Sequence, residues 1–226
     1  MSSERRLVVI AIDGPAGVGK STIARRLAQR LGFTYIDTGA MYRAVALWAR
    51  RQGVDPVDMH RMERLARAAT IELEPASSRV LLNGEDVSAE IRTPEIADAA
   101  SSAAAIPGVR RALVEKQRAM GASASVVMEG RDIGSVVFPS ADVKIFLDAD
   151  AQERVRRRMS EMAGVPNTVA EQLKQRDERD RGRSESPLLQ APDAVYIDST
   201  GLSPDEVEEA ILKVIRAKLS NGKGFK

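Results

Sequence analysis

The residues best suited to chemistry form a glycine-rich run near the N-terminus. From Gly14 to Ser21 the chain reads GPAGVGKS, which matches the pattern G-x-x-x-x-G-K-[ST]. Glycines let the backbone turn so that successive N–H groups point at phosphate oxygens, and a helix beginning directly afterwards adds further donors. Lys20 is suited to the β- and γ-phosphates and the Ser21 hydroxyl to Mg²⁺. The run therefore predicts a P-loop that binds a nucleoside triphosphate.

This motif alone does not distinguish kinases from GTPases, ATPases or motor domains. A GTPase needs a base-reading N-K-x-D stretch, which the sequence lacks. A switching ATPase stays open at this point.

Two later runs could bind the acceptor of a phosphoryl group. The Tyr42 ring could cover a base, and the Arg43 guanidinium next to it could bind a phosphate. Glu129 follows a buried strand and could help to hold Mg²⁺ through a water, while Arg131 offers a phosphate donor and Asp132 an acceptor. The alternatives are a core tyrosine with a surface arginine, and a simple ion pair at the end of a strand.

Arginines gather in two stretches of the second half. Arg176, Asp180 and Arg183 lie at i, i+4 and i+7, so they share a face if their helix continues to Arg183. Two guanidinium groups beside a carboxylate could hold a sugar hydroxyl and a transferring phosphoryl group together. A second stripe comprises Arg154, Arg157 and Arg158. It could close over ATP as a lid, or it could be a solvated basic face.

The elements that must position these residues alternate between strands and helices. Short apolar runs lie at 7–12, 33–36, 125–128, 143–147 and 194–197, and they indicate strands buried on both faces of a parallel sheet. Four of these runs end at aspartates and one at Glu129. Ligands of open α/β sheets bind at the carboxyl ends of strands, so the polar residues fall where a site is expected. We predict an α/β, three-layer P-loop NTPase fold around a five-stranded parallel sheet.

The intervening segments predict helices and one small insertion. Helical patterns cover 20–31, 41–51, 59–69, 94–105, 107–120, 151–162, 168–181 and the segment that begins at 203. Asn83-Gly84 lies between β-prone runs and is typical of a hairpin, which indicates a small antiparallel β insertion over 71–91. We expect residues 1–226 to form a single domain.

Composition excludes several classes of function. The 226 residues include 34 Lys plus Arg and 32 Asp plus Glu, so the net charge of +2 favours neither nucleic acid nor membrane as a partner. The chain has no Cys and one His, which excludes disulfides and Cys- or His-based metal sites. No apolar run approaches the roughly 20 residues of a membrane span, and no signal peptide is recognisable. We therefore expect a cytoplasmic protein. A regulatory nucleotide-binding or nucleic-acid-binding protein is the alternative from another class, although carboxylates interleaved with the arginines argue against a phosphate-tracking groove.

The sequence closely resembles bacterial cytidylate kinases from Ile10 to about Leu219. The stretches that carry this resemblance are IDGPAGVGKST, IDTGAMYRAVA, EDVSAEIRTPEIADAAS, EGRDIGSVVFP, KIFLDADAQER and RDERDRGR. The resemblance implies transfer of the γ-phosphoryl group of ATP to CMP or dCMP with Mg²⁺, in pyrimidine nucleotide metabolism. It also implies a monophosphate-binding region at about 38–120 and a helical lid at about 150–182. We expect a monomer with nucleotides as its partners.

The resemblance also implies roles for residues at matching positions. ATP would be bound by Gly14, Pro15, Ala16, Gly17, Val18, Gly19, Lys20, Ser21 and Thr22, with Arg157 from the lid. The acceptor would be bound by Thr38, Tyr42, Arg43, Ser101, Arg110, Arg131, Asp132, Arg176 and Asp180. Lys20, Arg176 and Arg183 would be catalytic, with Arg183 stabilising the transition state.

Three of the acceptor residues, Ser101, Arg110 and Asp132, would read cytosine. Asp132 can accept from the exocyclic amine, and Arg110 can donate to a ring acceptor. Uracil has a carbonyl in place of the amine and should bind worse. The same pair argues against the alternative of a uridylate- or shikimate-type kinase.

Overall fold

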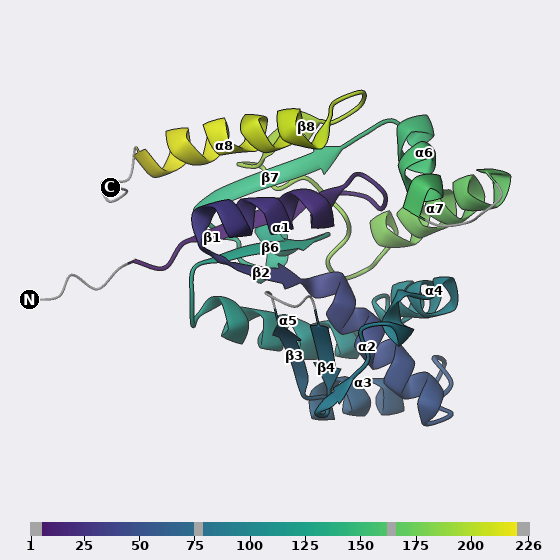
Figure 1. The fold of residues 1–226 in the computed structure, drawn as a ribbon. Coiled ribbons are helices and arrows are strands. Elements are labelled where there is room, and N and C mark those ends of the chain that lie inside the picture. The colour runs from purple at the N-terminus through teal and green to yellow at the C-terminus, as the bar shows by residue number, and fades with distance from the viewer. Residues whose placement is uncertain (1–5, 75–78, 162–165, 221–226) are drawn as a thin grey trace, which may run out of the picture.

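A five-stranded parallel sheet forms the centre of the molecule (Figure 1). The computed structural model describes residues 6–74, 79–161 and 166–220. In the order β2-β6-β1-β7-β8, the strands are Thr34–Asp37, Val126–Gly130, Val9–Asp13, Val143–Asp148 and Val195–Asp198. The predicted α/β fold is confirmed, and each predicted strand boundary lies within two residues of the observed one.

Helices cover both faces of this sheet. Alternate residues of a strand point to opposite faces, and Ile10 packs with α1 (Lys20–Leu31) and α8 (Pro204–Ser220). Ala11 packs on the other face with Val114 of α5 (Pro107–Gly121). Figure 1 shows α8 and α5 on opposite sides of the sheet. The three-layer arrangement follows from strands that are apolar on both faces.

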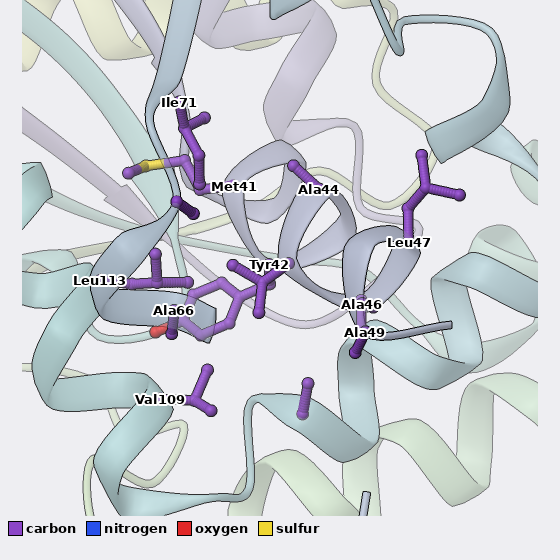
Figure 2. Close-up of a cluster of buried hydrophobic side chains, with 14 of the residues drawn as sticks. Met41, Tyr42, Ala44, Ala46, Leu47, Ala49, Ala66, Ile71, Val109 and Leu113 are labelled. Carbon is purple, nitrogen blue, oxygen red and sulfur yellow. The ribbon is translucent and has the colours of Figure 1, made fainter. Parts of the chain in front are cut away.

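The region predicted to bind the monophosphate has a hydrophobic core of its own around α2 (Thr38–Arg51). Figure 2 shows Met41 and Leu47 of this helix together with Ile71, Val109 and Leu113. The helices around this core are α3 (Met59–Ala68), α4 (Pro94–Ala103), the 3₁₀ turn η1 (Glu90–Arg92) and α5.

The predicted β insertion in this region is confirmed as a three-stranded antiparallel sheet. Its strands are β3 (Ile71–Glu74), β4 (Arg79–Leu82) and β5 (Glu85–Asp86). Asn83 and Gly84 make the β4–β5 turn with φ of 51° and 84°, a conformation that these two residue types favour.

The predicted lid comprises α6 (Ala151–Glu161) and α7 (Pro166–Arg181), which pack together and against Ala16 of the glycine-rich run. The Asp150 carboxylate caps α6 by accepting the Glu153 N–H at 2.7 Å. The predicted start of α7 at residue 168 is wrong, because the helix already includes Pro166, a residue that fits the first turn. Residue 162, the predicted end of α6, lies outside the described residues.

Two further differences concern the ends of strands. Helix α2 begins at Thr38 rather than Met41, because the Asp37 carboxylate accepts the Ala40 N–H at 2.9 Å and so caps the helix early. A π-helical turn, η2 (Ile133–Val137), follows β6 and was not predicted.

Among the described residues, no helix is both long and apolar enough to cross a membrane.

Candidate active site

A cavity of about 180 Å³ lies where the carboxyl ends of β2 and β6 meet the glycine-rich run and the lid. The predicted site residues that line it are Ala16, Gly17, Gly19, Lys20, Ser21, Thr22, Thr38, Tyr42, Arg43, Ser101, Arg110, Glu129, Arg131, Asp132, Arg176, Asp180 and Arg183. The predicted residues outside this lining are Gly14, Pro15, Val18 and Arg157. Residues far apart in the sequence thus meet in one place.

The glycine-rich run folds tightly against the sheet. Gly14 has a φ of 152°, and a Cβ there would lie 2.0 Å from the backbone oxygen of Leu147, so only glycine fits. The Lys20 ammonium group donates to the Pro15 carbonyl oxygen at 2.6 Å. Burial, and then the positive charge of Arg131, lower the pKa of Lys20 to about 7. Added negative charge beside Lys20 would therefore be strongly favourable.

Two of the predicted lid arginines bind the carbonyl oxygens of this run. Arg154 donates to the Ala16 oxygen at 3.2 Å and to the Asp177 carboxylate of α7 at 2.6 Å. Arg157 donates to the Val18 oxygen at 3.0 Å and to a backbone oxygen after β8 at 2.6 Å. Neither side chain lines the cavity, so the role of Arg157 at ATP stays a prediction.

The third arginine of that stripe behaves differently. Arg158, which was predicted with the other two to close over ATP, does line the cavity. Arg157 and Arg158 are adjacent, so they point about 100° apart around α6. The i, i+3, i+4 spacing therefore does not indicate a common role: Arg154 and Arg157 contact the glycine-rich run, and Arg158 lines the cavity.

Oxygen ligands gather at the ends of β2 and β6. Glu129 is buried and accepts the Tyr35 hydroxyl at 2.8 Å, while Thr38 donates to the Glu129 backbone oxygen at 2.7 Å. Burial, and then the charge of Asp37, raise the pKa of the Glu129 carboxyl. Arg43 is held by Asp37 at 2.8 Å, so the predicted phosphate donor already has an anionic partner.

These oxygens suit Mg²⁺ that arrives with a nucleotide. The Ser21 hydroxyl lines the cavity beside Glu129, and its hydrogen bond to that carboxyl partly opposes the rise in the Glu129 pKa caused by burial. Within the described parts of the chain, no group of three or more His, Cys, Asp or Glu could hold a metal ion. One hydroxyl and one nearby acid fit Mg²⁺ that takes its remaining ligands from phosphates and water.

A buried ion pair forms another wall of the cavity. Arg110 pairs with Asp132, with only 3% and 6% of their side chains exposed. The Arg110 guanidinium carbon lies 5.5 Å from the centre of the Tyr42 ring. The Ser101 hydroxyl and the Arg110 Nε are buried and have no hydrogen-bond partner. Leaving buried polar atoms unpaired is unfavourable, so this wall is suited to a flat polar ligand.

A carboxylate between two arginines completes the site. Asp180 accepts from Arg131 at 2.7 Å and pairs with Arg183 on its other oxygen. Burial opposes ionisation of Asp180, but Arg131 and then Arg183 hold its pKa below the ordinary value. Helix α7 ends at Arg181, so Arg183 reaches this cluster from beyond the helix and not along a continuing face. Burial, and then Arg131, lower the pKa of Arg176 to about 10.

Sequence reasoning assigned no role to several residues that shape the site. Asp177 holds Arg154, Tyr35 holds Glu129, and Asp13 contacts the segment after Asp132. Asp13 was noted as the acidic end of a strand, but its partners are 120 or more residues away in the sequence. No local signal identifies such a contact.

Comparison with known proteins agrees with the geometry. The family model for cytidylate kinase matches residues 10–217. A cytidylate kinase of Solibacter usitatus is 62% identical, covering 99% of this chain and 98% of that protein. One of Geobacter sp. strain M21 is 50% identical over 95% of each chain. A bifunctional pantoate ligase/cytidylate kinase of Parasynechococcus marenigrum is 47% identical over 95% of this chain and 44% of its own length.

Solved structures share the fold at low identity. An uncharacterised protein from Eubacterium ventriosum superposes with a TM-score of 0.57 and 14% identity, covering 94% of this chain and 99% of that one. A gluconokinase from Sinorhizobium meliloti gives 0.50 and 15%, covering 96% and 97%. These two likenesses concern the fold alone. The family match and the close relatives carry more: the chain belongs to the cytidylate kinase family, whose members phosphorylate CMP and dCMP with ATP.

Proposed function

We propose that the cavity described above is where this chain transfers the γ-phosphoryl group of ATP to CMP or dCMP, giving ADP and CDP or dCDP. The observation that carries the proposal is the buried Arg110–Asp132 pair beside the unpartnered Ser101 hydroxyl, in the same cavity as Lys20. A base-reading wall and a phosphate loop in one cavity suit a kinase that acts on a nucleotide.

The base is recognised by hydrogen-bond complementarity. Asp132 accepts a hydrogen bond from the exocyclic amine of cytosine, and Arg110 donates one to a ring acceptor. The Ser101 hydroxyl, which has no partner in the protein, makes a further hydrogen bond to the base. Uracil would bring a carbonyl oxygen against the Asp132 carboxylate, leaving two acceptors face to face. A site built on such hydrogen bonds rejects the wrong base strongly, so UMP is a poor acceptor.

The acceptor phosphate binds Arg43, Arg131 and Arg176, next to Thr38, and Asp180 binds a sugar hydroxyl. An ionised oxygen of this phosphate attacks the γ-phosphorus of ATP in line, and the bond to the β–γ bridging oxygen breaks as ADP leaves. The attacking oxygen carries no proton, so the protein supplies no general base. Lys20, Arg176 and Arg183 stabilise the charge spread over the transferring group.

ATP binds residues 14–22 through the backbone N–H groups of the loop. Ser21 would hold Mg²⁺ directly and Glu129 through a water. When bound, the ion neutralises charge on the β- and γ-phosphates. A single domain, a monomeric state and a cytoplasmic location stay predictions.

An ADP-release assay with Mg-ATP tests the proposal, with CMP, dCMP, UMP, AMP and shikimate as acceptors. We expect fast turnover of CMP and dCMP and weak turnover of UMP. Strong turnover of UMP or AMP would contradict the base-reading role of Asp132 and Arg110. Absence of turnover with every acceptor would contradict the proposed kinase activity.

A further inference from the structure

Asp13 is a buried carboxylate that the proposed transfer does not use. It is the last residue of β1, directly before the glycine-rich run, and only 5% of it is exposed. One carboxylate oxygen accepts the N–H of Ile133 at 2.8 Å, and the other accepts the N–H of Gly134 at 2.7 Å. Both oxygens are therefore directed at the backbone that follows Asp132.

The two N–H groups belong to the first turn of η2, where helical donors have no partner within the turn. Such donors are usually capped by the residue just before the helix. Here that residue is Asp132, but its carboxylate makes no capping bond and pairs instead with Arg110. Asp13 supplies from β1 the cap that Asp132 cannot supply while it faces the cavity.

The carbonyl group of Asp132 is also held by hydrogen bonds. Its carbonyl oxygen accepts the N–H of Val136 at 2.9 Å and of Val137 at 3.1 Å. The peptide that follows Asp132 is thus bound at its oxygen by η2 and at its nitrogen by Asp13. The backbone that carries the Asp132 side chain is therefore fixed, while the carboxylate itself is paired with Arg110.

Gly134 lies close to both Lys144 and Asp13. A Cβ there would lie 3.1 Å from the Lys144 side chain, a tight contact, and 3.4 Å from the Asp13 carboxylate, an ordinary one. The Lys144 ammonium group is itself bound by Asp193 and the Pro139 oxygen, so it does not serve as the counter-ion of Asp13. Burial raises the pKa of Asp13 to about 6 even though two N–H groups bind it.

We propose that Asp13 is a positioning residue that fixes the orientation of Asp132 and thereby sets the discrimination between cytosine and uracil. This inference rests on the proposed function, in which Asp132 reads the exocyclic amine. Asp13 itself does not line the cavity. It acts on the base through Asp132, although it neighbours the phosphate loop in the sequence.

The test is the variant Asp13→Asn, which keeps the shape but sets an amide donor against one of the two N–H groups. We expect kcat/KM for CMP to fall and the CMP-to-UMP ratio of kcat/KM to drop about tenfold or more, since misplaced polar groups weaken discrimination. The KM for ATP should change by less than about twofold, because the phosphate loop keeps its own contacts. A raised KM for ATP with an unchanged CMP-to-UMP ratio would overturn the inference.

Two control variants separate positioning from stability. Asp148→Asn changes the aspartate at the end of the neighbouring strand β7, where it accepts the Ala149 N–H at 2.9 Å, and should leave the ratio unchanged. Ile211→Val loosens the core under α8, where Ile211 is fully buried, and should lower Tm without altering the ratio. A lower ratio in either control would attribute the effect to general loosening and refute the inference.

A second route covers the case in which Asp13→Asn does not fold. Asp13→Glu lengthens the side chain by one methylene and so displaces the carboxylate from the N–H groups of Ile133 and Gly134. It should lower the same ratio, and an unchanged ratio in this variant would refute the inference. Asp132→Asn serves as the reference for the proposed function. If Asp132→Asn leaves the ratio unchanged, base reading by Asp132 fails. If Asp132→Asn lowers the ratio and Asp13→Asn does not, only the positioning role fails.

Discussion

Replacing Arg183 by alanine should separate catalysis from folding. If Arg183 stabilises the transferring phosphoryl group, Arg183→Ala lowers kcat by about 10³ or more, as loss of an arginine does in other phosphoryl transfers. This factor corresponds to about 4 kcal/mol of transition-state stabilisation. The KM for CMP should change much less, because Arg131 and Arg176 still bind the acceptor phosphate.

The fold should survive this substitution. Breaking a buried ion pair costs about 3–5 kcal/mol when it leaves a charge without compensation. Arg183 pairs with Asp180, of which 1% of the side chain is exposed, but Asp180 also accepts from Arg131 at 2.7 Å. Because Asp180 keeps this partner, we expect the free energy of unfolding to fall by less than about 3 kcal/mol, within the roughly 5–15 kcal/mol of a typical domain.

The assay combines steady-state kinetics with urea unfolding of the same preparations. Arg181→Ala is the matched control, since this exposed arginine lies at the end of α7, two residues before Arg183. Its kcat should stay within about twofold of the wild type, as for ordinary surface substitutions. A loss of less than about tenfold in folded Arg183→Ala would remove Arg183 from the catalytic role.

Three further predictions concern ATP and the metal. Arg154→Ala removes the bonds to the Ala16 oxygen and to Asp177, so KM for ATP should rise about tenfold while KM for CMP stays nearly constant in steady-state kinetics. Burial, and then Arg131, lower the pKa of Lys20 to about 7 in the nucleotide-free protein. Bound phosphates should raise this pKa, so binding of Mg-ATP at pH 8 should take up a proton. Calorimetry in buffers of different ionisation enthalpy should find this uptake, weaker binding as pH rises above 7, and neither effect in Lys20→Met. A chelator should abolish turnover yet leave the Tm of the nucleotide-free protein unchanged, because no metal-binding cluster of three or more acidic or His side chains occurs in the described residues.

The sheet and the phosphate loop could be predicted because their signals are local. A strand buried on both faces needs a continuous apolar run, such as the one before Asp13, and a phosphate loop needs its glycines and lysine at fixed spacing. The early start of α2 was also a local matter, since Asp37 is a favourable capping residue. Asp37 is both the last residue of β2 and the cap of α2, and a predicted helix start at residue 41 leaves the second role out.

Other features depend on which surface a side chain meets, and local spacing does not determine that. The stripe that includes Arg154 and Arg157 was interpreted as a lid over ATP, but both side chains bind carbonyl oxygens of the phosphate loop. The turn η2 has no periodic signal, and its cap comes from Asp13 across 120 residues. Such contacts arise only when the sheet brings β1 beside β6.

The charges of the site indicate where phosphates are most needed. Burial by itself would lower the pKa values of Arg110 and Arg131, but neighbouring groups together raise them, first Tyr42 and then Asp132 at Arg110, and first Asp180 at Arg131. Those of Lys20, Arg176 and Arg183 are lowered, first of all by burial. A bound phosphate lowers the free-energy cost of burying a cation, and it does so most for a cation whose neighbouring carboxylates offset that cost least. Lys20, Arg176 and Arg183 are also the three proposed catalytic cations. In the nucleotide-free protein their charges are buried, so the negative charge of the transferring phosphoryl group should stabilise them strongly.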